Sequence, residues 1–349
     1  MFSMKSVINP HRGSGLHGDA VFDAPAPSTA ADAVEALLQR CPVAAPTPLI
    51  DAGGLAQALG VAKAYIKDER ARMGLGSFKA LGAAYVIAHQ AAATGASDMS
   101  TALSGRTYVT ASAGNHGMSV AAGARVFGAD AVVYLADTVP ESFAQRLRDK
   151  GAEVRREGSD YAASMDGAER AARDEGFTLL SDSSWHGYLD LPWRLMEGYL
   201  AMAAETVRQM PEPPTHIYLQ AGVGGMAGAA AAFFREAWGD APQIIVVEPE
   251  NAPALIESIQ AGRVVDTAGA DSHMGRLDCK TPSTIALRGL SRDADQFVTI
   301  SEAEGEAVLP LLAREGLDTS SSGGAGVAAV LAAPPEDARI LCILSEAPA

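Results

Sequence analysis

The sequence predicts an α/β protein in which twisted, mostly parallel β-sheet is flanked by helices. Short apolar runs alternate with Ala-rich helical segments from about residue 64 onward, and this βαβ order is typical of a parallel sheet covered on both faces. Hydrophobic residues make up 48% of the chain, and there are 35 glycines, as in α/β enzymes with closely packed helices. The length of 349 residues is enough for two domains or lobes.

The first half of the chain predicts a loop-rich start followed by regular alternation. Residues 1–45 are expected to be mostly loop, with one short helix over 29–39. The alternation begins with a strand at 64–67. The elements expected next, in chain order, are a helix at 80–88, a strand at 107–110, a helix at 116–127, a strand at 131–135, a helix at 142–150, a strand at 153–154, a helix at 161–175 and a strand at 178–180.

The second half continues the same pattern after two turns. Turns at 190–192 and 211–214 flank a segment that we interpret as a connector between the lobes. The expected elements are a helix at 193–208, a strand at 216–219, a helix at 226–238, a strand at 244–247 and a last strand at 340–344.

Charge and composition exclude several classes of partner. The net charge of −15 argues against nucleic acid and against an anionic membrane surface. The longest apolar run, residues 226–234, is too short to cross a bilayer, and residues 1–18 lack the apolar core of a secretory signal. Cys41, Cys279 and Cys342 are widely spaced and form neither a disulfide framework nor a metal-ligand pattern. We therefore expect a cytoplasmic protein without a metal site.

Lys79 is the first candidate functional residue, at the start of the helix expected over 80–88. Ser77 is a plausible N-cap, which would put Lys79 in the first helical turn. There the helix dipole and desolvation by Phe78 and Leu81 would lower the pKa of the lysine. A lysine with a lowered pKa is suited to forming a Schiff base with a carbonyl cofactor. A solvated surface lysine is the competing interpretation, and further motifs decide between them.

The second candidate site is the turn at 110–117, between a strand and a helix. Ligands bind at the carboxyl edge of a parallel sheet, and the free amides of such a turn, with the hydroxyls of Thr110 and Ser112, suit a small carboxylate. Asn115 could reach a cofactor oxygen. Taken alone, the segment could also be an ordinary turn rich in Gly and Asn.

The third candidate site is the glycine turn at 220–228, again between a strand and a helix. Residues without side chains let backbone amides close around a phosphate at a helix N-terminus. Glu248 lies twenty residues beyond Gly228 at the end of the next strand, so the segment also resembles a dinucleotide-binding fingerprint. A nicotinamide-dependent oxidoreductase is therefore an alternative, although it leaves Lys79 and Asn115 unexplained.

The fourth motif is the serine and glycine run at 320–326, which precedes an Ala/Val helix. A serine hydroxyl beside a pyridine nitrogen can hydrogen-bond without protonating the ring, which would favour chemistry at the β-carbon over transamination. A capping serine cluster with glycines for close packing explains the same residues.

Together, these motifs resemble those of the fold-type II pyridoxal-phosphate enzymes, the family of serine/threonine dehydratases, cysteine synthase and the tryptophan synthase β chain. Within it, the chain is most similar to the diaminopropionate ammonia-lyases. The resemblance runs from about Pro46 to Val330 and includes segments 67–69, 77–85, 113–117, 182–188, 215–216, 220–224, 247–249, 274–279 and 322–323.

The resemblance implies a two-lobed fold and a set of site residues. The large, cofactor-binding lobe would comprise residues 1–83 and 192–349, and a smaller, mobile lobe residues 84–191. The cofactor would be pyridoxal 5'-phosphate. The cofactor-binding residues would be Lys79 at its aldehyde, Phe78, Asn115 at its phenolic oxygen, Gly222, Val223, Gly224, Gly225 and Met226 around its phosphate, and Ser322 at its ring nitrogen. The substrate carboxylate would bind Thr110, Ser112, Ala113, Gly114, Asn115 and His116.

Asp182 matches an acidic residue that the ammonia-lyases use in proton transfer, so it joins Lys79 as a catalytic candidate. It could equally be a carboxylate that caps a loop. Where the ammonia-lyases carry a second acidic residue, this chain has Ala113. Since the two acids are assigned to opposite enantiomers of the substrate, the sequence leaves the stereochemistry open. The segment 112–116 is also similar to that of threonine dehydratases.

The leading hypothesis is a β-eliminating ammonia-lyase that acts on 2,3-diaminopropionate or a related β-substituted amino acid. Such an enzyme would release a 2-oxo acid and ammonia, and a general acid would protonate the leaving group. A serine, threonine or hydroxyaspartate dehydratase is the nearest alternative, and a catalytically silent cofactor-binding regulator is a third. The family implies a homodimer.

Overall fold

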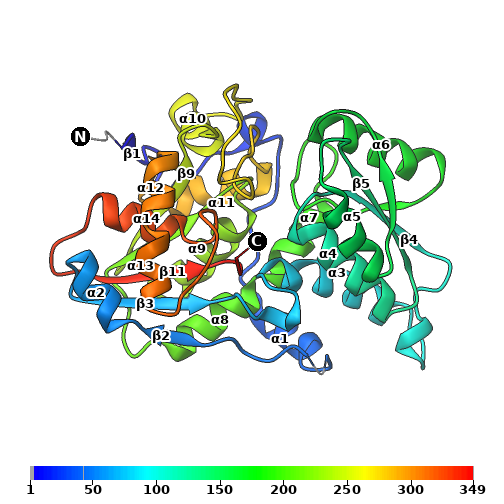
Figure 1. Ribbon diagram of the computed structural model, residues 1–349, viewed down its shortest axis with the longest axis horizontal. Coiled ribbons are helices and arrows are strands. Elements are labelled where there is room, and N and C mark those ends of the chain that lie inside the picture. The colour runs from blue at the N-terminus through cyan, green and yellow to red at the C-terminus, as the bar shows by residue number, and fades with distance from the viewer. Residues whose placement is uncertain (1–3, 42, 349) are drawn as a thin grey trace.

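The computed structural model describes residues 4–41 and 43–348, and it contains two β-sheets that lie side by side (Figure 1). The larger sheet has the strand order β1-β10-β9-β8-β11-β3-β2, and the smaller one β6-β5-β4-β7. The strands are β1 Ser6–Ile8, β2 Leu49–Asp51, β3 Lys63–Asp68, β4 Thr107–Ala111, β5 Asp130–Leu135, β6 Glu153–Arg156, β7 Thr178–Leu179, β8 His216–Gln220, β9 Gln243–Pro249, β10 Gln296–Ile300 and β11 Arg339–Leu344.

Helices pack around both sheets (Figure 1). The α-helices are α1 Ala31–Leu38, α2 Gly53–Leu59, α3 Lys79–Ala93, α4 Asn115–Val126, α5 Glu141–Asp149, α6 Tyr161–Asp174, α7 Asp190–Gly198, α8 Leu200–Gln209, α9 Gly225–Trp238, α10 Ala254–Ala261, α11 Thr284–Asp293, α12 Glu302–Ala307, α13 Leu309–Arg314 and α14 Ala325–Ala332. Short 3-10 helices are η1 Gly18–Val21, η2 Arg72–Gly74 and η3 Met99–Thr101.

Both sheets are mainly parallel, which confirms the predicted fold class. In the larger sheet β10, β9, β8, β11 and β3 run parallel, and only the edge strands β1 and β2 are antiparallel. All strands of the smaller sheet are parallel. The central strands are buried along nearly their whole length, as β11 is from Ile340 to Leu344. This burial is why they appear in the sequence as continuous apolar runs rather than as alternating ones.

The predicted single helix at 193–208 is wrong in detail. The structure has two helices there, α7 and α8, with Tyr199 between them. The predicted turn at 190–192 is also wrong, because Pro192 lies in the first turn of α7. Proline is tolerated at that position because the first amides of a helix have no helical acceptor. The strands β1, β2 and β10 and the helices α2 and α10 to α13 were not predicted.

Close helix packing fixes the position of α3, which begins with Lys79. A Cβ atom on Gly198 of α7 would come within 2.5 Å of the Leu81 carbonyl oxygen, and one on Gly82 within 2.8 Å of the Tyr199 ring. These glycines therefore allow α3 and α7 to approach until their backbones nearly touch. The contact joins α3, which follows β3 of the larger sheet, to α7, which follows β7 of the smaller sheet.

A buried ion cluster lies beside the connection from β3 to α3. Its charged members are Lys67, Glu69, Arg72 and Glu205, with Thr47 as a neutral partner. Glu205 Oε2 accepts hydrogen bonds from Lys67 Nζ at 2.7 Å and from an Arg72 amino group at 2.7 Å. Burial acts to raise the pKa of Glu205, but the contacts with Arg72 and Lys67 lower it on balance. The cluster ties β3 to α8 and braces the segment that precedes Lys79.

Among the helices of the described residues, none is long and apolar enough to cross a membrane. Nor do those residues contain a group of three or more His, Cys, Asp or Glu side chains that could hold a metal ion.

Candidate functional site

Lys79 is the first residue of α3, so its predicted place in the first helical turn is confirmed. The predicted Ser77 cap is wrong. The N-cap is Phe78, which has helical backbone angles and makes no side-chain cap. The amide of Phe78 donates to the Ser345 carbonyl oxygen at 3.1 Å, so the end of β11 holds the start of α3 in place of a cap.

Asp182 lies against Lys79, although 103 positions separate them in the chain. The Lys79 ammonium donates a hydrogen bond to the Asp182 carboxylate, and each side chain is about one-fifth exposed. Burial acts to lower the pKa of Lys79, but the Asp182 charge, the nearby Tyr199 and the hydrogen bond to Asp182 together outweigh it and raise the pKa above its ordinary value. The predicted lowering is therefore wrong in this structure, because the prediction considered only residues near Lys79 in sequence. Despite burial, Lys79 and His116 hold the pKa of Asp182 below its usual range.

Several buried polar atoms in the segments that carry Lys79, His116 and Tyr199 have no hydrogen-bond partner in the part of the chain that the structure describes. Among the described residues, the Ser77 and Thr110 hydroxyls, His116 Nδ1 and the Tyr199 hydroxyl are buried and unpaired. Tyr199 stacks edge-on against Phe78, with ring centroids 5.0 Å apart. Since buried polar groups are normally paired, these four mark a place built to receive a polar ligand. We call Lys79, Asp182 and these four residues the Lys79 site.

The turn at 110–116 lies at the carboxyl end of β4, as predicted. Ser112 Oγ accepts hydrogen bonds from the amides of Gly114 and Gly117, at 3.2 and 3.1 Å. Its hydroxyl hydrogen remains a possible donor to a ligand. His116 Nε2 contacts the Leu180 carbonyl oxygen at 2.8 Å, and burial lowers the pKa of the imidazole. His116 therefore links the 110–116 turn to Leu180 and lies near Asp182.

In the glycine turn between β8 and α9, Gly222 and Gly224 have no room for a side chain. Gly224 is the N-cap of α9 and has φ of +95°, in the left-handed region. A Cβ on Gly222 would lie 2.9 Å from Cys279 Sγ and 3.1 Å from the Arg276 carbonyl oxygen. A Cβ on Gly225 would lie 3.8 Å from the Asp182 carbonyl oxygen. The turn therefore presents the amides of a helix N-terminus next to Asp182, and such amides favour the binding of an anion. Val223 precedes Gly224 in this turn, and Met226 follows Gly225.

Ser322 lies just before α14, and its hydroxyl accepts a hydrogen bond from the Arg276 amide at 3.2 Å. Ser345 is close by, because its amide donates to the Gly323 carbonyl oxygen at 3.4 Å. Ser345 is buried and follows β11 directly. Two serines therefore lie at this side of the site, and only Ser322 was predicted from the sequence.

Four further side chains belong to this region and were given no role from sequence: Tyr161, Tyr199, Arg276 and Glu346. Tyr161 begins α6 and is 57% exposed, yet the surrounding protein and the Asp182 charge raise the pKa of its hydroxyl. Only Glu346 had a usable signal, as a carboxylate two residues after a buried strand.

The Cys279 thiol and the Glu248 carboxyl could in principle react or bind a ligand, but their surroundings prevent it. Burial, with the Asp182 charge, raises the pKa of the Cys279 thiol to about 12, so the thiol stays neutral. Glu248 is buried, and its carboxylate accepts hydrogen bonds from the amides of Leu255 and Ile256 at 2.7 and 2.8 Å. It caps the start of α10 and is not available to a nucleotide ribose, which removes the main support for the oxidoreductase alternative.

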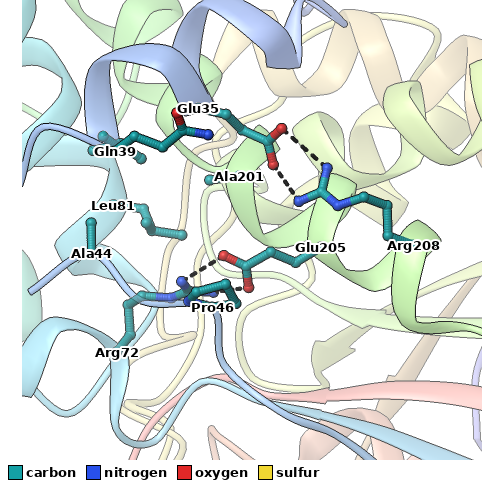
Figure 2. A pocket seen from close by; sticks show the side chains of 10 residues that line it. Glu35, Gln39, Ala44, Pro46, Arg72, Leu81, Ala201, Glu205 and Arg208 are labelled. Carbon is teal, nitrogen blue, oxygen red and sulfur yellow. Dashed lines mark hydrogen bonds and ion pairs between the residues drawn. The ribbon is translucent and has the colours of Figure 1, made fainter.

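A cavity of about 400 Å³ lies elsewhere, between α1, α8 and the start of α3. Figure 2 shows two ion pairs in its wall, Arg72 with Glu205 and Arg208 with Glu35. None of the predicted site residues lines it. Its charged groups are already paired with one another, so the cavity lacks the unpaired polar atoms that distinguish the Lys79 site.

Comparison with known proteins shows the family and the fold to which this chain is similar. The pyridoxal-phosphate dependent enzyme family matches residues 41–346. The diaminopropionate ammonia-lyase of Salmonella typhimurium is 32% identical over 325 residues, which cover 84% of this chain and 80% of the relative. The crystal structure of the Escherichia coli diaminopropionate ammonia lyase in complex with an aminoacrylate-PLP azomethine reaction intermediate has a TM-score of 0.86 at 27% identity, covering 99% of this chain and 94% of that one. The L-threonine ammonia-lyase of Thermotoga maritima is 28% identical, covering 76% of this chain and 62% of the relative.

Proposed function

This chain belongs to the pyridoxal-phosphate dependent enzyme family, and we propose that it eliminates the β-amino group of 2,3-diaminopropionate or of a related β-substituted amino acid. The products would be a 2-oxo acid and ammonia. The observation that carries the proposal is the Lys79–Asp182 pair together with the unpaired polar groups. The relatives named as diaminopropionate ammonia-lyases support the substrate class.

The residues present fit pyridoxal phosphate. Gly222 and Gly224 pack too closely against Cys279, Ala286 and Leu255 to carry a Cβ, so the backbone of the turn is held in place, and its helix N-terminus suits the phosphate. The cofactor-holding residues would be Lys79 at the aldehyde, Phe78 beside the ring, Asn115 at the phenolic oxygen, Gly222, Val223, Gly224, Gly225 and Met226 around the phosphate, and Ser322 at the ring nitrogen. Ser345 is a second candidate for that last contact. When bound, this cofactor supplies an aldehyde that condenses with amines and a ring that withdraws electrons from the α-carbon.

The amides and hydroxyls of the 110–116 turn would hold the substrate carboxylate, through Thr110, Ser112, Ala113, Gly114, Asn115 and His116. Fixing that group orients the bond to the α-hydrogen before the proton moves. The Lys79 amine would accept the α-proton at Nζ.

Asp182 is the proposed proton carrier for the leaving group. An amine leaves a carbon poorly unless it is protonated. Asp182 lies within hydrogen-bonding distance of Lys79 Nζ. Burial acts to raise the pKa of Asp182 and the Lys79 charge holds it low, so Asp182 would carry a proton to the departing nitrogen while Lys79 is neutral. Ala113 offers no acid on its side of the turn, which favours one enantiomer of the substrate.

The two-lobed division supports a simple assignment of tasks. We assign cofactor binding to residues 1–83 and 192–349 and treat 84–191 as the smaller, mobile lobe. The larger sheet draws its strands from the first part and the smaller sheet from the second. A homodimer and a cytoplasmic location remain predictions.

A dehydratase acting on β-hydroxy amino acids is the second candidate, because Ala113 and the similarity to an L-threonine ammonia-lyase favour it. A screen for oxo-acid release separates the two. Both enantiomers of β-amino, β-hydroxy and β-chloro amino acids would be supplied to the holoenzyme without a second substrate. Faster turnover of 2,3-diaminopropionate than of serine or threonine supports the proposal. Release from none of them contradicts both candidates, and a spectral change without product would indicate a silent regulator.

A further inference from the structure

Glu346 is a buried carboxylate that the proposed reaction does not use. It is 7% exposed and lies two residues beyond the end of β11. Its backbone forms an antiparallel bridge with Ser77, and its carbonyl oxygen accepts a hydrogen bond from the Thr319 hydroxyl at 2.5 Å. The main chain therefore holds Glu346 firmly in the segment that also contacts the start of α3.

The Glu346 side chain connects three separate parts of the chain. Its carboxylate accepts hydrogen bonds from Asn115 Nδ2 at 2.5 Å and from the Ser320 hydroxyl, and it lies 3.5 Å from Arg276 Nε. Asn115 begins α4, which follows a strand of the smaller sheet, whereas Ser320 and Arg276 belong to loops around the larger one. Figure 1 marks the C-terminal end of the chain between the two sheets. Glu346 thus joins the two lobes beside the Lys79 site.

Arg276 strengthens the same connection. One amino group of its guanidinium donates to the Ala113 carbonyl oxygen at 3.4 Å, and a Cβ on Gly114 would lie 3.4 Å from that nitrogen. Its amide donates to Ser322, and its carbonyl oxygen lies against Gly222. Arg276 therefore contacts the turn at 110–117, the serine and glycine run at 320–326 and the glycine turn at 220–228. Its guanidinium also forms an ion pair with the Glu346 carboxylate.

The contact with Glu346 determines how the Asn115 amide is oriented. A carboxylate only accepts hydrogen bonds, so the amide must turn its NH2 group, not its oxygen, toward Glu346. That NH2 group carries two hydrogens, and one remains free to donate to a second oxygen. Without the carboxylate, the amide could rotate by half a turn and present its oxygen instead.

We propose that Glu346 is a positioning residue that fixes the Asn115 amide as a donor to the cofactor's phenolic oxygen and holds the 112–115 turn against the larger lobe. The inference rests on the proposed function for the identity of the cofactor. It does not depend on the substrate, so cofactor binding tests it even if the elimination reaction proves to be wrong.

The experiment compares Glu346→Gln, Asn115→Ala and the double variant with Glu336→Gln, an exposed control glutamate far from these contacts. The apo proteins are titrated with pyridoxal phosphate, and the Kd and the visible absorbance band of the bound cofactor are recorded. Glu346→Gln is expected to weaken cofactor binding about 10- to 100-fold, the range found when a residue that orients a ligand is removed. It should also shift the absorbance band, which a purely structural change would leave in place.

The double variant decides whether Glu346 acts through Asn115. If it does, Glu346→Gln adds little in the Asn115→Ala background, because the amide it orients is already absent. Effects that add fully, or a Kd and band equal to those of Glu336→Gln, would overturn the proposal. If Glu346→Gln fails to fold, Glu346→Asp keeps the charge but shortens the reach. Glu346→Asp is then expected to show the same band shift and loss of cofactor affinity. A Kd and an absorbance band equal to those of the wild type would contradict the proposal.

Discussion

Two groups of charged side chains, one buried and one about one-fifth exposed, lie beside the connection from β3 to α3. They differ in how completely their polar atoms are paired. In the buried ion cluster before the connection, Arg72 donates to Glu69 and Glu205, and Lys67 donates to Glu205 and Thr47. In the Lys79 site after it, one ion pair occurs with four buried polar groups that have no partner within the described residues.

The difference separates structural charge from functional charge. Burying an ion pair costs desolvation, which is offset only when the remaining hydrogen-bonding groups are also satisfied. The buried ion cluster meets that condition and needs no ligand. The Lys79 site does not meet it, so its unpaired groups are explained by a polar ligand. Mutations in the first group should therefore affect folding, and mutations in the second should affect chemistry.

The largest effect on activity is expected from Asp182→Asn, which removes the acid but keeps the shape. We expect kcat to fall about 10²- to 10⁴-fold, the usual contribution of a positioned acid or base. Oxo-acid release at saturating substrate measures it, with Asp137→Asn as an exposed control. Unchanged kcat would remove Asp182 from the reaction and leave it as a loop carboxylate.

The largest effect on stability is expected from Arg72→Ala. The change leaves Glu69 and Glu205 buried without their main partner, and breaking a buried pair in this way costs about 3–5 kcal/mol. Urea unfolding of the apo protein measures the free energy of unfolding. A loss below about 1 kcal/mol would show that the buried ion cluster is dispensable, and the contrast with the Lys79 site would fail.

Glu248 gives a smaller effect that depends on pH. Burial raises the pKa of this carboxyl to about 8, even though two backbone amides donate to it. Because the folded-state pKa lies above the unfolded one, its contribution to stability is full at low pH and is lost as pH rises toward 8. Glu248→Gln mimics the protonated form, so its stability relative to wild type should increase between about pH 5 and pH 8.

Urea unfolding at several pH values measures that trend, with the exposed Glu236→Gln as the matched control. A difference between Glu248→Gln and wild type that is constant across this range would mean that Glu248 is ionised in the folded protein.

The smallest effect is expected from Arg208→Ala, which breaks the pair with Glu35 in the cavity wall (Figure 2). Arg208 is 56% exposed, and exposed pairs contribute about 0–1 kcal/mol. Urea unfolding beside Arg72→Ala gives the direct contrast between an exposed and a buried arginine in the same cavity wall. A loss equal to that of Arg72→Ala would show that burial does not explain the difference.

Local patterns predicted much of the fold and the glycine turns, because a buried strand followed by glycines and a helix is contained in a few consecutive residues. The short edge strands β1 and β2 were missed, since three residues carry almost no periodicity. The split at Tyr199 was missed because the helical pattern continues through it. In each case the tertiary packing, and not the local sequence, determines the outcome.

Charge interactions across the chain were the least predictable part of the site. The pKa of Lys79 was predicted to fall, because the neighbours visible in sequence are apolar, whereas Asp182 raises it from 103 positions away. Lys67 lies in the segment 67–69, which resembles that of fold-type II pyridoxal-phosphate enzymes, but its partner Glu205 is 138 positions away in the chain. Glu346 and Arg276 reach the 112–115 turn only because the two lobes fold against each other.

The most direct test is to reduce the holoenzyme with borohydride and map the modified peptide. The proposal predicts that a pyridoxyl group becomes fixed on Lys79, while Lys67, which is buried and paired with Glu205, stays unmodified. A Lys79→Ala variant should bind no reducible cofactor. Modification of another lysine, or an unchanged imine spectrum in Lys79→Ala, would contradict the assignment of the Lys79 site.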